Sequence, residues 1–171
     1  KLLFTHKVNK YLVKYGFTVH VHSICCFNDL FFGTFSYFCD SYMPLMIKKI
    51  IHTTNAPAPI GPYSQAILSG TTLYVSGQVA FDPESGNLVT DSIQNETHRV
   101  MKNIGAILLE AGYSFSDIVK CSIFVKDLNN FAAINEVYGV YVGETKPARE
   151  TVEVARLPRD VNVEISCIAV K

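Results

Sequence analysis

Residues 147–170 read Pro147-Ala-Arg-Glu-Thr-Val-Glu-Val-Ala-Arg-Leu-Pro-Arg-Asp-Val-Asn-Val-Glu-Ile-Ser-Cys-Ile-Ala-Val170 and decide the fold. The run over residues 161–167 alternates apolar and polar side chains, which is the period of a strand with one buried face. Glu164 lies on the polar side of this run, and Arg149 lies at the start of the preceding strand. A turn at residues 157–160 joins the two strands, because proline presets a turn and aspartate can bond its own backbone. We therefore expect a strand pair that brings one arginine and one carboxylate to the same sheet.

From residue 46 onward the chain alternates strands and helices. One helix is expected between Asp91, which can cap it with Gln94 at the capping-box position, and Gly112, which ends it. A second helix begins near Asn129 and carries its apolar residues on one stripe. Further strands are expected over residues 47–53, 63–68, 72–78 and 118–126. The predicted order β-β-β-α-β-α-β-β indicates an α+β fold, with a mostly antiparallel sheet and two helices packed on one face.

The opposite face of this sheet would have no helix over it. Apolar groups are expected there, mixed with Tyr63, Ser76, Glu164 and Ser166. A two-layer domain with one uncovered sheet face usually needs a partner, so the pattern predicts an oligomer.

Composition and charge describe a globular domain with no electrostatic attraction to nucleic acid. Of the 171 residues, 49% are apolar and 18% charged, which argues against a disordered chain. Residues 46–171 carry eleven basic and thirteen acidic side chains, a net charge of −2. A slightly acidic domain lacks the basic surface that nucleic-acid binding uses, so such a partner is not expected.

The cysteine pattern favours free thiols over disulfides. Only Cys121 and Cys167 lie after residue 45, both within apolar strand patterns where buried free thiols are common. A reducing compartment, the cytoplasm, is therefore expected. His52 and His98 are isolated, and no Cys-x-x-Cys motif occurs, so we expect neither a metal nor a cofactor.

Residues 1–45 differ from the rest and are placed outside the domain. They are rich in Phe, Tyr and Cys without helical or strand periodicity, and their apolar run over residues 30–39 is too short to cross a bilayer. Three interpretations stay open: upstream sequence, a transit peptide for a mitochondrion or plastid, or a folded extension. The domain is predicted to span residues 46–171, with Met46 as its natural start.

Four ordered motifs lie after residue 46: Ile60-Gly-Pro-Tyr-Ser-Gln-Ala66, Ser76-Gly-Gln78, Val125-Lys-Asp-Leu-Asn-Asn-Phe131, and Pro147-Ala-Arg149 with Val152-Glu-Val-Ala-Arg-Leu-Pro158. Together they resemble the RidA family of reactive-intermediate enamine/imine deaminases, also called liver perchloric-acid-soluble ribonucleases. The resemblance covers nearly all of residues 46–171 and none of residues 1–45. It implies a chorismate-mutase-like α+β fold, a homotrimer, and ligand pockets between subunits.

The resemblance also implies roles for single residues. Arg149 would clamp the substrate carboxylate, because a guanidinium matches a carboxylate with two parallel hydrogen bonds. Glu164 would orient or activate the water that hydrolyses a 2-imino or enamine acid, such as 2-iminobutanoate or 2-iminopropanoate, to a 2-keto acid and ammonia. Thr151 stands where some members have a cysteine, which argues against an obligatory thiol nucleophile. The remaining pocket residues would be Tyr63, Ser76, Gly77 and Asn135.

Other interpretations of the same residues stay open. Taken alone, Arg149 also fits a surface ion pair with Glu150 or Glu153, and Glu164 fits a solvated strand position. A non-catalytic sensor of carboxylic-acid metabolites would use the same arginine and differ only at Glu164. A single-stranded RNA endoribonuclease or translation inhibitor is disfavoured, since metal-free RNA cleavage usually needs a paired acid and base in a basic groove.

Overall fold

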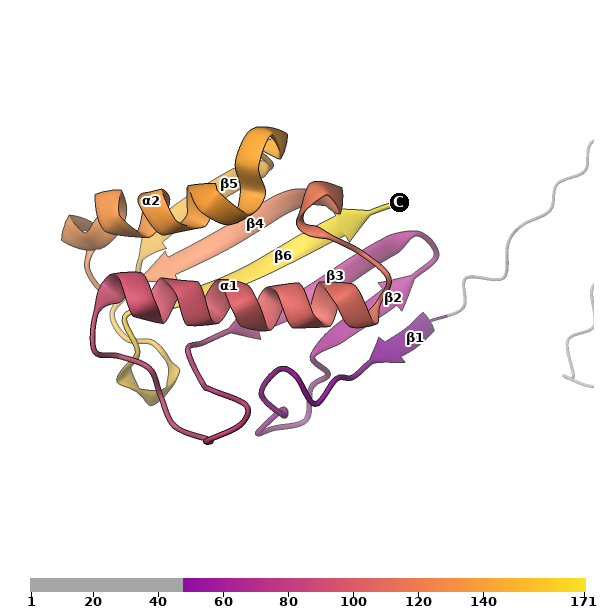
Figure 1. The fold of residues 1–171 in the computed structure, drawn as a ribbon, viewed down its shortest axis with the longest axis horizontal. Coiled ribbons are helices and arrows are strands. Elements are labelled where there is room, and N and C mark those ends of the chain that lie inside the picture. The colour runs from indigo at the N-terminus through magenta and orange to yellow at the C-terminus, as the bar shows by residue number, and fades with distance from the viewer. Residues whose placement is uncertain (1–47) are drawn as a thin grey trace, which may run out of the picture. The chain divides into compact units, whose positions relative to one another are not determined.

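The computed structural model describes residues 48–171, and the calls on residues 1–45 and on a boundary at Met46 lie outside this range. Six strands and two helices follow one another in the predicted order (Figure 1). Their bounds are β1 Lys48–Ile51, β2 Ala66–Ser69, β3 Thr72–Gln78, α1 Ile93–Glu110, β4 Ile118–Val125, α2 Phe131–Val142, β5 Ala148–Glu153 and β6 Val163–Val170.

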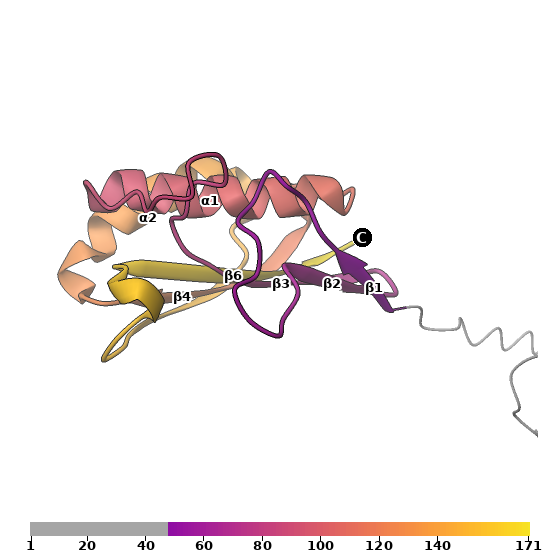
Figure 2. The same cartoon turned by 90° about the horizontal axis from the view of Figure 1, so that it is seen from below.

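The strands form one sheet in the order β1-β2-β3-β6-β4-β5, and every neighbouring pair except β4 and β5 is antiparallel. Both helices lie on one face of this sheet, as Figure 2 shows edge-on. The predicted α+β class, the mostly antiparallel sheet and the single helical layer are confirmed.

The expected pairing of the last two strands is wrong. β4 lies between β5 and β6, so the two strands that carry Arg149 and Glu164 are not neighbours. The reason is the crossover: α2 connects β4 to β5, and a strand that returns through a helix lies parallel beside its predecessor. Residues 154–162 then carry the chain across to the other side of β4, where β6 pairs with it antiparallel.

Several element ends also differ from the prediction. α1 is capped by Ser92, not by Asp91, because Ser92 has the extended backbone of a cap and its Oγ accepts a hydrogen bond from the Asn95 amide at 3.2 Å. The second strand begins at Ala66, which leaves Tyr63 in the preceding loop. Gly112 follows the helix with φ of 78°, a left-handed conformation that glycine adopts without steric cost.

The core lies between the sheet and the two helices. In β6, burial alternates along the strand as the sequence pattern predicts. Val163, Ile165, Cys167 and Ala169 are buried toward the helices. Glu164, Ser166 and Ile168 are half-buried on the opposite face, and Val170 at the end of the strand is exposed. Full burial of each aliphatic side chain contributes roughly 1.5–3 kcal/mol. A shift of one residue would reverse every side chain of β6, so this burial fixes where Glu164 points.

A buried carboxylate ties α1 to the start of β6. Glu96 is fully buried and accepts hydrogen bonds from the backbone amide and side-chain amide of Asn162, at 2.7 and 2.8 Å. It also accepts from the Val163 amide at 3.4 Å. The charge is thus compensated by donors from the segment that immediately precedes Glu164.

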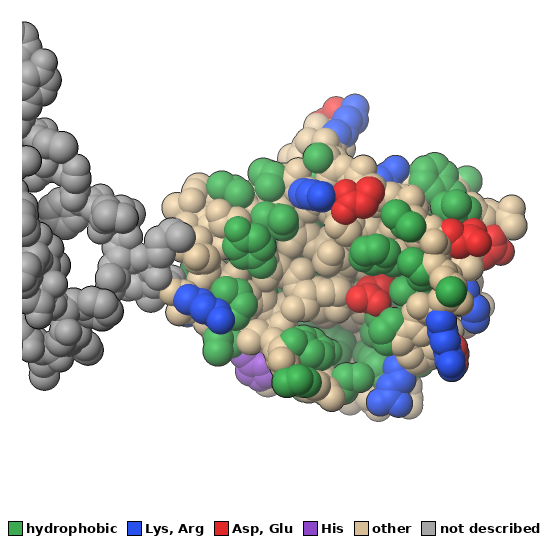
Figure 3. All heavy atoms as spheres, turned by 180° about the vertical axis from the view of Figure 1, so that it is seen from behind, with side chains coloured by type: hydrophobic (Ala, Val, Ile, Leu, Met, Phe, Trp, Pro, Cys, Tyr) green, Lys and Arg blue, Asp and Glu red, His purple; other side chains and the backbone are tan. Residues whose placement is uncertain are grey.

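The uncovered sheet face is partly apolar. Figure 3 shows green apolar side chains spread over it among polar atoms and acidic and basic groups. The strand register aligns Ile50, Ile67, Tyr74 and Ile168 in one row across four strands of this face. Ile50 and Tyr74 remain 63% and 50% exposed. Neither helix of the described residues is long and apolar enough to cross a membrane.

Candidate functional site

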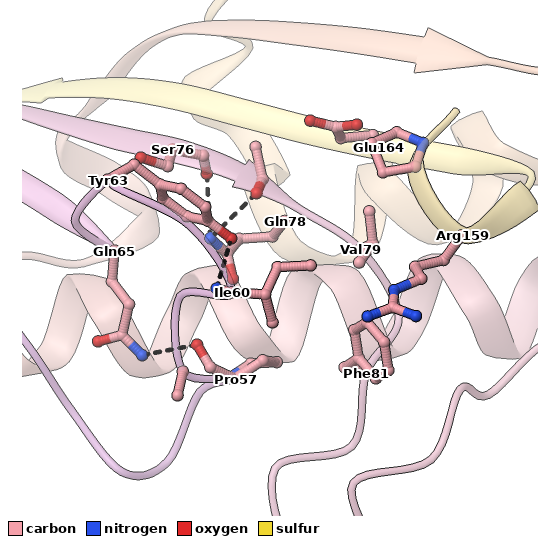
Figure 4. A pocket seen from close by; sticks show the side chains of 13 residues that line it. Pro57, Ile60, Tyr63, Gln65, Ser76, Gln78, Val79, Phe81, Arg159 and Glu164 are labelled. Atoms are coloured by element: carbon pink, nitrogen blue, oxygen red, sulfur yellow. Dashed lines mark hydrogen bonds between the residues drawn. The ribbon is translucent and has the colours of Figure 1, made fainter. Parts of the chain in front are cut away.

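A cavity of about 420 Å³ opens on the uncovered side of the sheet, between β3, β6 and two loops (Figure 4). This size is within the range of small-molecule pockets, roughly 300–1,000 Å³. Four of the seven predicted site residues line it: Tyr63, Ser76, Gly77 and Glu164. The other lining residues are Pro57, Ala58, Ile60, Gln65, Gln78, Val79, Phe81, Pro158 and Arg159.

Gly77 lets the Glu164 carboxylate lie directly against the backbone of β3. The register between β3 and β6 is irregular between Val75 and Gln78, and Gly77 lies inside this interruption. A Cβ atom built on Gly77 would overlap Oε1 of Glu164 and approach its Cδ to 2.8 Å. Glycine at this position is therefore a condition for the observed placement of the carboxylate.

The Glu164 carboxylate has no hydrogen-bond or ion-pair partner among residues 48–171. Burial raises the pKa of this carboxyl above its ordinary value of 4.5, since its charged form is partly removed from water. A half-buried carboxyl with a raised pKa can accept and return a proton closer to neutral pH than an exposed one. This is the property that the proposed water-activating role requires.

The proline-rich loop before β2 forms the opposite wall of the cavity, and Gln65 holds it. The buried Gln65 side chain accepts a hydrogen bond from the Thr53 amide at 2.7 Å. It donates to the backbone carbonyls of Thr53, Ala56 and Pro57 at 2.9–3.1 Å. Prolines cannot donate backbone hydrogen bonds, so this loop has no regular structure of its own, and one side-chain amide fixes its course.

Two further predicted residues of this cavity, Tyr63 in the loop and Ser76 on β3, are half-exposed or already hydrogen-bonded. Tyr63 is 49% exposed, and its hydroxyl accepts a weak 3.4 Å hydrogen bond from the Ile60 amide. The Ser76 hydroxyl donates to the Ser64 carbonyl at 2.7 Å. In Figure 4 both side chains lie at the end of the cavity away from Arg159.

Arg149 lies elsewhere, against α2. Its Nη1 donates a 2.6 Å hydrogen bond to Oδ1 of Asn135. Its guanidinium carbon lies 5.2 Å from the ring centroid of Tyr138 and 5.6 Å from that of Phe131, both cation–π distances. A shallow second cavity surrounds this group, lined by Asn135, Tyr138, Gly139, Val142, Gly143, Lys146, Pro147 and Arg149.

Arg149 and Glu164 point to opposite faces of the sheet. Arg149 pairs in register with the buried Cys121 on the helical side, whereas Glu164 pairs with Phe124 on the uncovered side. Thr151 shares the side of Arg149, and its buried hydroxyl lacks a hydrogen-bond partner among residues 48–171. The seven predicted residues therefore form two groups: Tyr63, Ser76, Gly77 and Glu164 in one, and Asn135, Arg149 and Thr151 in the other.

The alternative ion pairs considered for Arg149 do not form. Glu150 lies on the uncovered side, where it accepts a hydrogen bond from Ser122 and pairs with Lys120 at 3.3 Å. Glu153 accepts the Leu128 amide at 2.9 Å. Arg149 is thus free of a carboxylate partner among the described residues and is held by a neutral amide and two rings.

Sequence reasoning missed three residues that shape the two cavities: Gln65, Tyr138 and Arg159. Tyr138 was assigned only to the apolar stripe of the second helix, and Arg159 only to a turn. Gln65 had a usable signal, because the carbonyls of a proline-rich loop need donors and a glutamine beside that loop can supply them. Cys121 and Cys167 are buried and unpaired, as predicted.

The comparisons with known proteins concern the same part of the chain. The model of the family described as Endoribonuclease L-PSP matches residues 53–171. The chain belongs to this family, the RidA family. The resemblance inferred from the four motifs is confirmed.

Several named relatives match this domain, and the match extends over nearly the whole length of each relative. A RutC family protein of Pyrococcus horikoshii is 53% identical over 125 residues, which are 73% of this chain and 99% of the relative. The 2-iminobutanoate/2-iminopropanoate deaminase of Mus musculus is 46% identical over 129 residues, 75% of this chain and 96% of the mouse protein. The structure of E. coli TdcF with bound serine is 43% identical with a TM-score of 0.69, covering 72% of this chain and 98% of TdcF.

Proposed function

We propose that this RidA-family protein hydrolyses small 2-imino acids to 2-keto acids and ammonia, at a site that two copies of the chain build together. The observation that carries the proposal is the division of the candidate site. Within residues 48–171, one face presents a half-buried carboxylate with no partner, and the other presents an arginine with no carboxylate partner. Relatives named as 2-iminobutanoate/2-iminopropanoate deaminases support the reaction, and a relative with bound serine supports a small carboxylic-acid ligand.

The uncovered sheet face is the surface on which a second copy would pack. In its apolar row, Ile50 and Tyr74 are exposed while Ile67 and Ile168 are half-buried, and Val152, beside Phe124 in register, is 44% exposed. We expect three copies in a closed ring, so that the Glu164 face of each copy meets the Arg149 edge of the next. Three equivalent sites would result.

Arg149 would bind the α-carboxylate of the substrate. A guanidinium forms a bidentate pair with a carboxylate, and this pair is stronger when the site is partly closed to water. Asn135 and the rings of Phe131 and Tyr138 already orient the side chain, which reduces the entropy lost on binding. Binding the carboxylate there would aim the adjacent C=N carbon at Glu164 of the neighbouring copy.

Glu164 would carry the proton transfers. As the water oxygen bonds to the C=N carbon of the iminium, one water proton passes to Glu164 and a carbinolamine forms. Glu164 then returns this proton to the amine nitrogen, the C–N bond breaks, and ammonia leaves. The hydroxyl proton goes to the departing ammonia, so that iminium and water yield the 2-keto acid and one ammonium ion. The raised pKa of Glu164 suits a group that must accept and then donate a proton.

The ribonuclease interpretation receives no support from the described residues. His52 follows β1 and His98 lies on α1, where its Nδ1 is 3.1 Å from the Tyr141 hydroxyl. Neither histidine lines the Glu164 cavity, so the cavity lacks the paired acid and base that metal-free RNA cleavage usually uses.

Mixed oligomers test the reaction, the trimer and the division of the site together. Arg149→Ala and Glu164→Gln chains with different affinity tags are co-expressed, and oligomers that carry both tags are isolated. Each mixed ring contains one interface with an intact Glu164 and an intact Arg149, so about one third of the parental activity on 2-iminobutanoate should return. Each variant alone should be nearly inactive. Arg149→Ala mixed with the double variant is the matched control, because no interface in it is intact.

The possible results separate the parts of the proposal. If the parent protein does not hydrolyse 2-iminobutanoate, the deaminase function is wrong. If the parent is active but the mixed rings stay inactive, Arg149 and Glu164 do not meet between copies. Sedimentation of the parent as a stable monomer at micromolar concentration would contradict the ring itself.

A further inference from the structure

One end of the Glu164 cavity has a composition that hydrolysis of a short imino acid does not require. Val79, Phe81 and Arg159 line it, and Figure 4 shows the Arg159 guanidinium beside Phe81, at the end away from Tyr63. Two apolar side chains followed by one cation match a ligand with a short methylene segment that ends in a negative charge.

The Arg159 guanidinium is available for such a ligand. It has no hydrogen bond or ion pair within residues 48–171. Its neighbours are satisfied without it: Arg156 and Asp160 form a bidentate pair, with N–O distances of 2.7 and 2.9 Å. A cation that lines a cavity and makes no ion pair can attract an anionic group to its end of that cavity.

The backbone holds Arg159 at this position at a conformational cost. Arg159 and Asp160 have φ of 60° and 58°, the left-handed region that side chains other than glycine rarely adopt. The turn is fixed at both ends by the buried side chains of Leu157 and Val161, and the Asp160 amide donates to the Leu157 carbonyl at 3.1 Å. Arg159 is therefore presented by a constrained turn, in contrast to an arginine on an extended surface loop.

We infer that Arg159 is a specificity residue that lets the site accept 2-imino acids whose side chain ends in a second carboxylate. The inference rests on the proposed deaminase function. The α-carboxylate would be bound by Arg149 of the neighbouring copy, and the C=N carbon would lie at Glu164. The side chain would then run along Val79 and Phe81, and its distal carboxylate would pair with Arg159. The substrate class is a 2-imino dicarboxylic acid of four or five carbons.

The test compares a neutral and a dicarboxylic imine in the full-length protein. Imines are generated in the assay from 2-aminobutanoate and from glutamate by amino-acid oxidases, and keto-acid formation in the presence of excess oxidase is followed. Arg159→Asn removes the charge while keeping a residue that tolerates the left-handed backbone. Arg159→Lys keeps the charge. Lys102→Gln, on the exposed side of α1, is the control for the same change in net charge.

Arg159→Asn should lower kcat/KM for the glutamate-derived imine about five- to thirtyfold, the size of one partly exposed charge-assisted pair. The 2-aminobutanoate-derived imine should change less than about twofold, since its side chain carries no charge to lose a partner. Arg159→Lys should retain most of the activity on the dicarboxylic imine, and Lys102→Gln should resemble the parent with both. The difference between the two substrates should shrink as salt is raised, because the pair is open to solvent.

Equal losses with both imines would show that Arg159 only supports the turn, and unchanged rates with both would show that it contacts no substrate. Either result overturns the inference and leaves the proposed function intact. If the parent hydrolyses neither imine, the proposed function fails. Calorimetry then measures the affinity of the parent and of Arg159→Asn for 2-oxoglutarate and 2-oxobutanoate, which tests whether Arg159 binds a second carboxylate. Tighter binding of 2-oxoglutarate than of 2-oxobutanoate by the parent, lost in Arg159→Asn, supports the inference. Equal affinities of the parent for the two keto acids contradict it.

Discussion

Glu164 and Arg149 lie on the two strands that flank β4, yet the chain holds them in different ways. Glu164 is on a central strand between fully buried Val163 and Ile165, so packing of its neighbours determines where it points. Arg149 is on the edge strand β5 and is exposed, and its orientation depends on Asn135 and two aromatic rings. The burial of its neighbours therefore fixes the side of the sheet on which Glu164 lies, whereas the orientation of Arg149 depends on each of its few contacts.

The comparison also supports the proposal that a second copy of the chain completes the site. A carboxylate on one face and an arginine on the other cannot act on the same small molecule through the sheet. Substitutions on the two sides should therefore fail in different ways, one in binding and the other in chemistry.

The largest effect is expected from Arg149. Loss of a bidentate charge-assisted pair in a partly desolvated pocket costs about 2–5 kcal/mol, so Arg149→Ala should lower kcat/KM for 2-iminobutanoate by about two to three decades or more. Arg149→Lys should recover little of this, since an ammonium cannot reproduce the guanidinium fork. Steady-state kinetics and 2-oxobutanoate affinity measure the change, and Lys102→Gln is the control. Normal binding of 2-oxobutanoate by Arg149→Ala would place the carboxylate site elsewhere.

Glu164 should give the second largest effect, and on a different quantity. Glu164→Gln preserves the shape of the side chain but cannot accept a proton, so kcat should fall by roughly two decades while affinity for the 2-keto acid changes little. In the parent, kcat/KM should fall on acidification through the raised pKa of Glu164, because the protonated carboxyl cannot take a proton from water. Hydrolysis at the parental rate by Glu164→Gln would contradict the proton-transfer role of Glu164, because catalysis would then not need this carboxylate.

Gly77→Ala should disturb the same side indirectly. The added methyl group overlaps Oε1 of Glu164, so the carboxylate must move, and misplacement by about 1 Å can cost up to about a hundredfold in rate. The fold should lose little stability, since the overlapping atom is the end of a flexible side chain. A double-mutant cycle gives the sharp readout: in the Glu164→Gln background, Gly77→Ala should add almost no further loss in kcat. Independent, additive losses would show that Gly77 acts on something other than Glu164.

The sequence was sufficient to predict the features that depend on packing against the helices, such as the buried face of β6 and the bounds of β3. The alternation over residues 161–167 set which side of β6 faces the helices, and this alone placed Glu164 on the uncovered face. The strand Thr72–Gln78 was predicted with its observed bounds, because apolar alternation and the Ser69-Gly70 turn agree there. The family motifs contributed the grouping of Tyr63, Ser76 and Gly77 with Glu164.

What the sequence could not show is which strands become neighbours. Residues 147–170 look like a hairpin because a turn separates two strands, but the α2 crossover places β5 beside β4 and moves β6 to the other side of β4. The sequence also did not show on which face of the sheet Arg149 lies, because β5 is an edge strand with little buried surface and no clear alternation. The prediction that Arg149 and Glu164 lie in the same sheet is confirmed, but the sequence did not show that they lie on opposite faces of it.

The smallest expected effect concerns stability, and it separates the two sides of the site once more. Burial raises the pKa of Glu164 in the folded protein, so the folded state binds its proton more tightly than the unfolded chain does. Well above the raised pKa, the carboxylate is charged in both states, and the folded state alone bears the cost of partial desolvation.

Glu164→Gln removes this cost and should raise Tm at neutral pH by a few degrees at most. As the pH falls from the raised pKa toward the ordinary value of 4.5 and below it, both states become protonated and the advantage should vanish. Arg149→Gln also replaces a charged side chain by a neutral amide, but on the exposed edge strand. It should show no such gain at neutral pH, because the Arg149 guanidinium of the parent is exposed to water and the variant loses its hydrogen bond to Asn135. Thermal unfolding of both variants at several pH values and one fixed protein concentration checks this. A Glu164→Gln protein that is less stable than the parent at neutral pH would mean that the carboxylate already has a stabilising partner in the assembled protein, and its role as an uncompensated base would then be wrong.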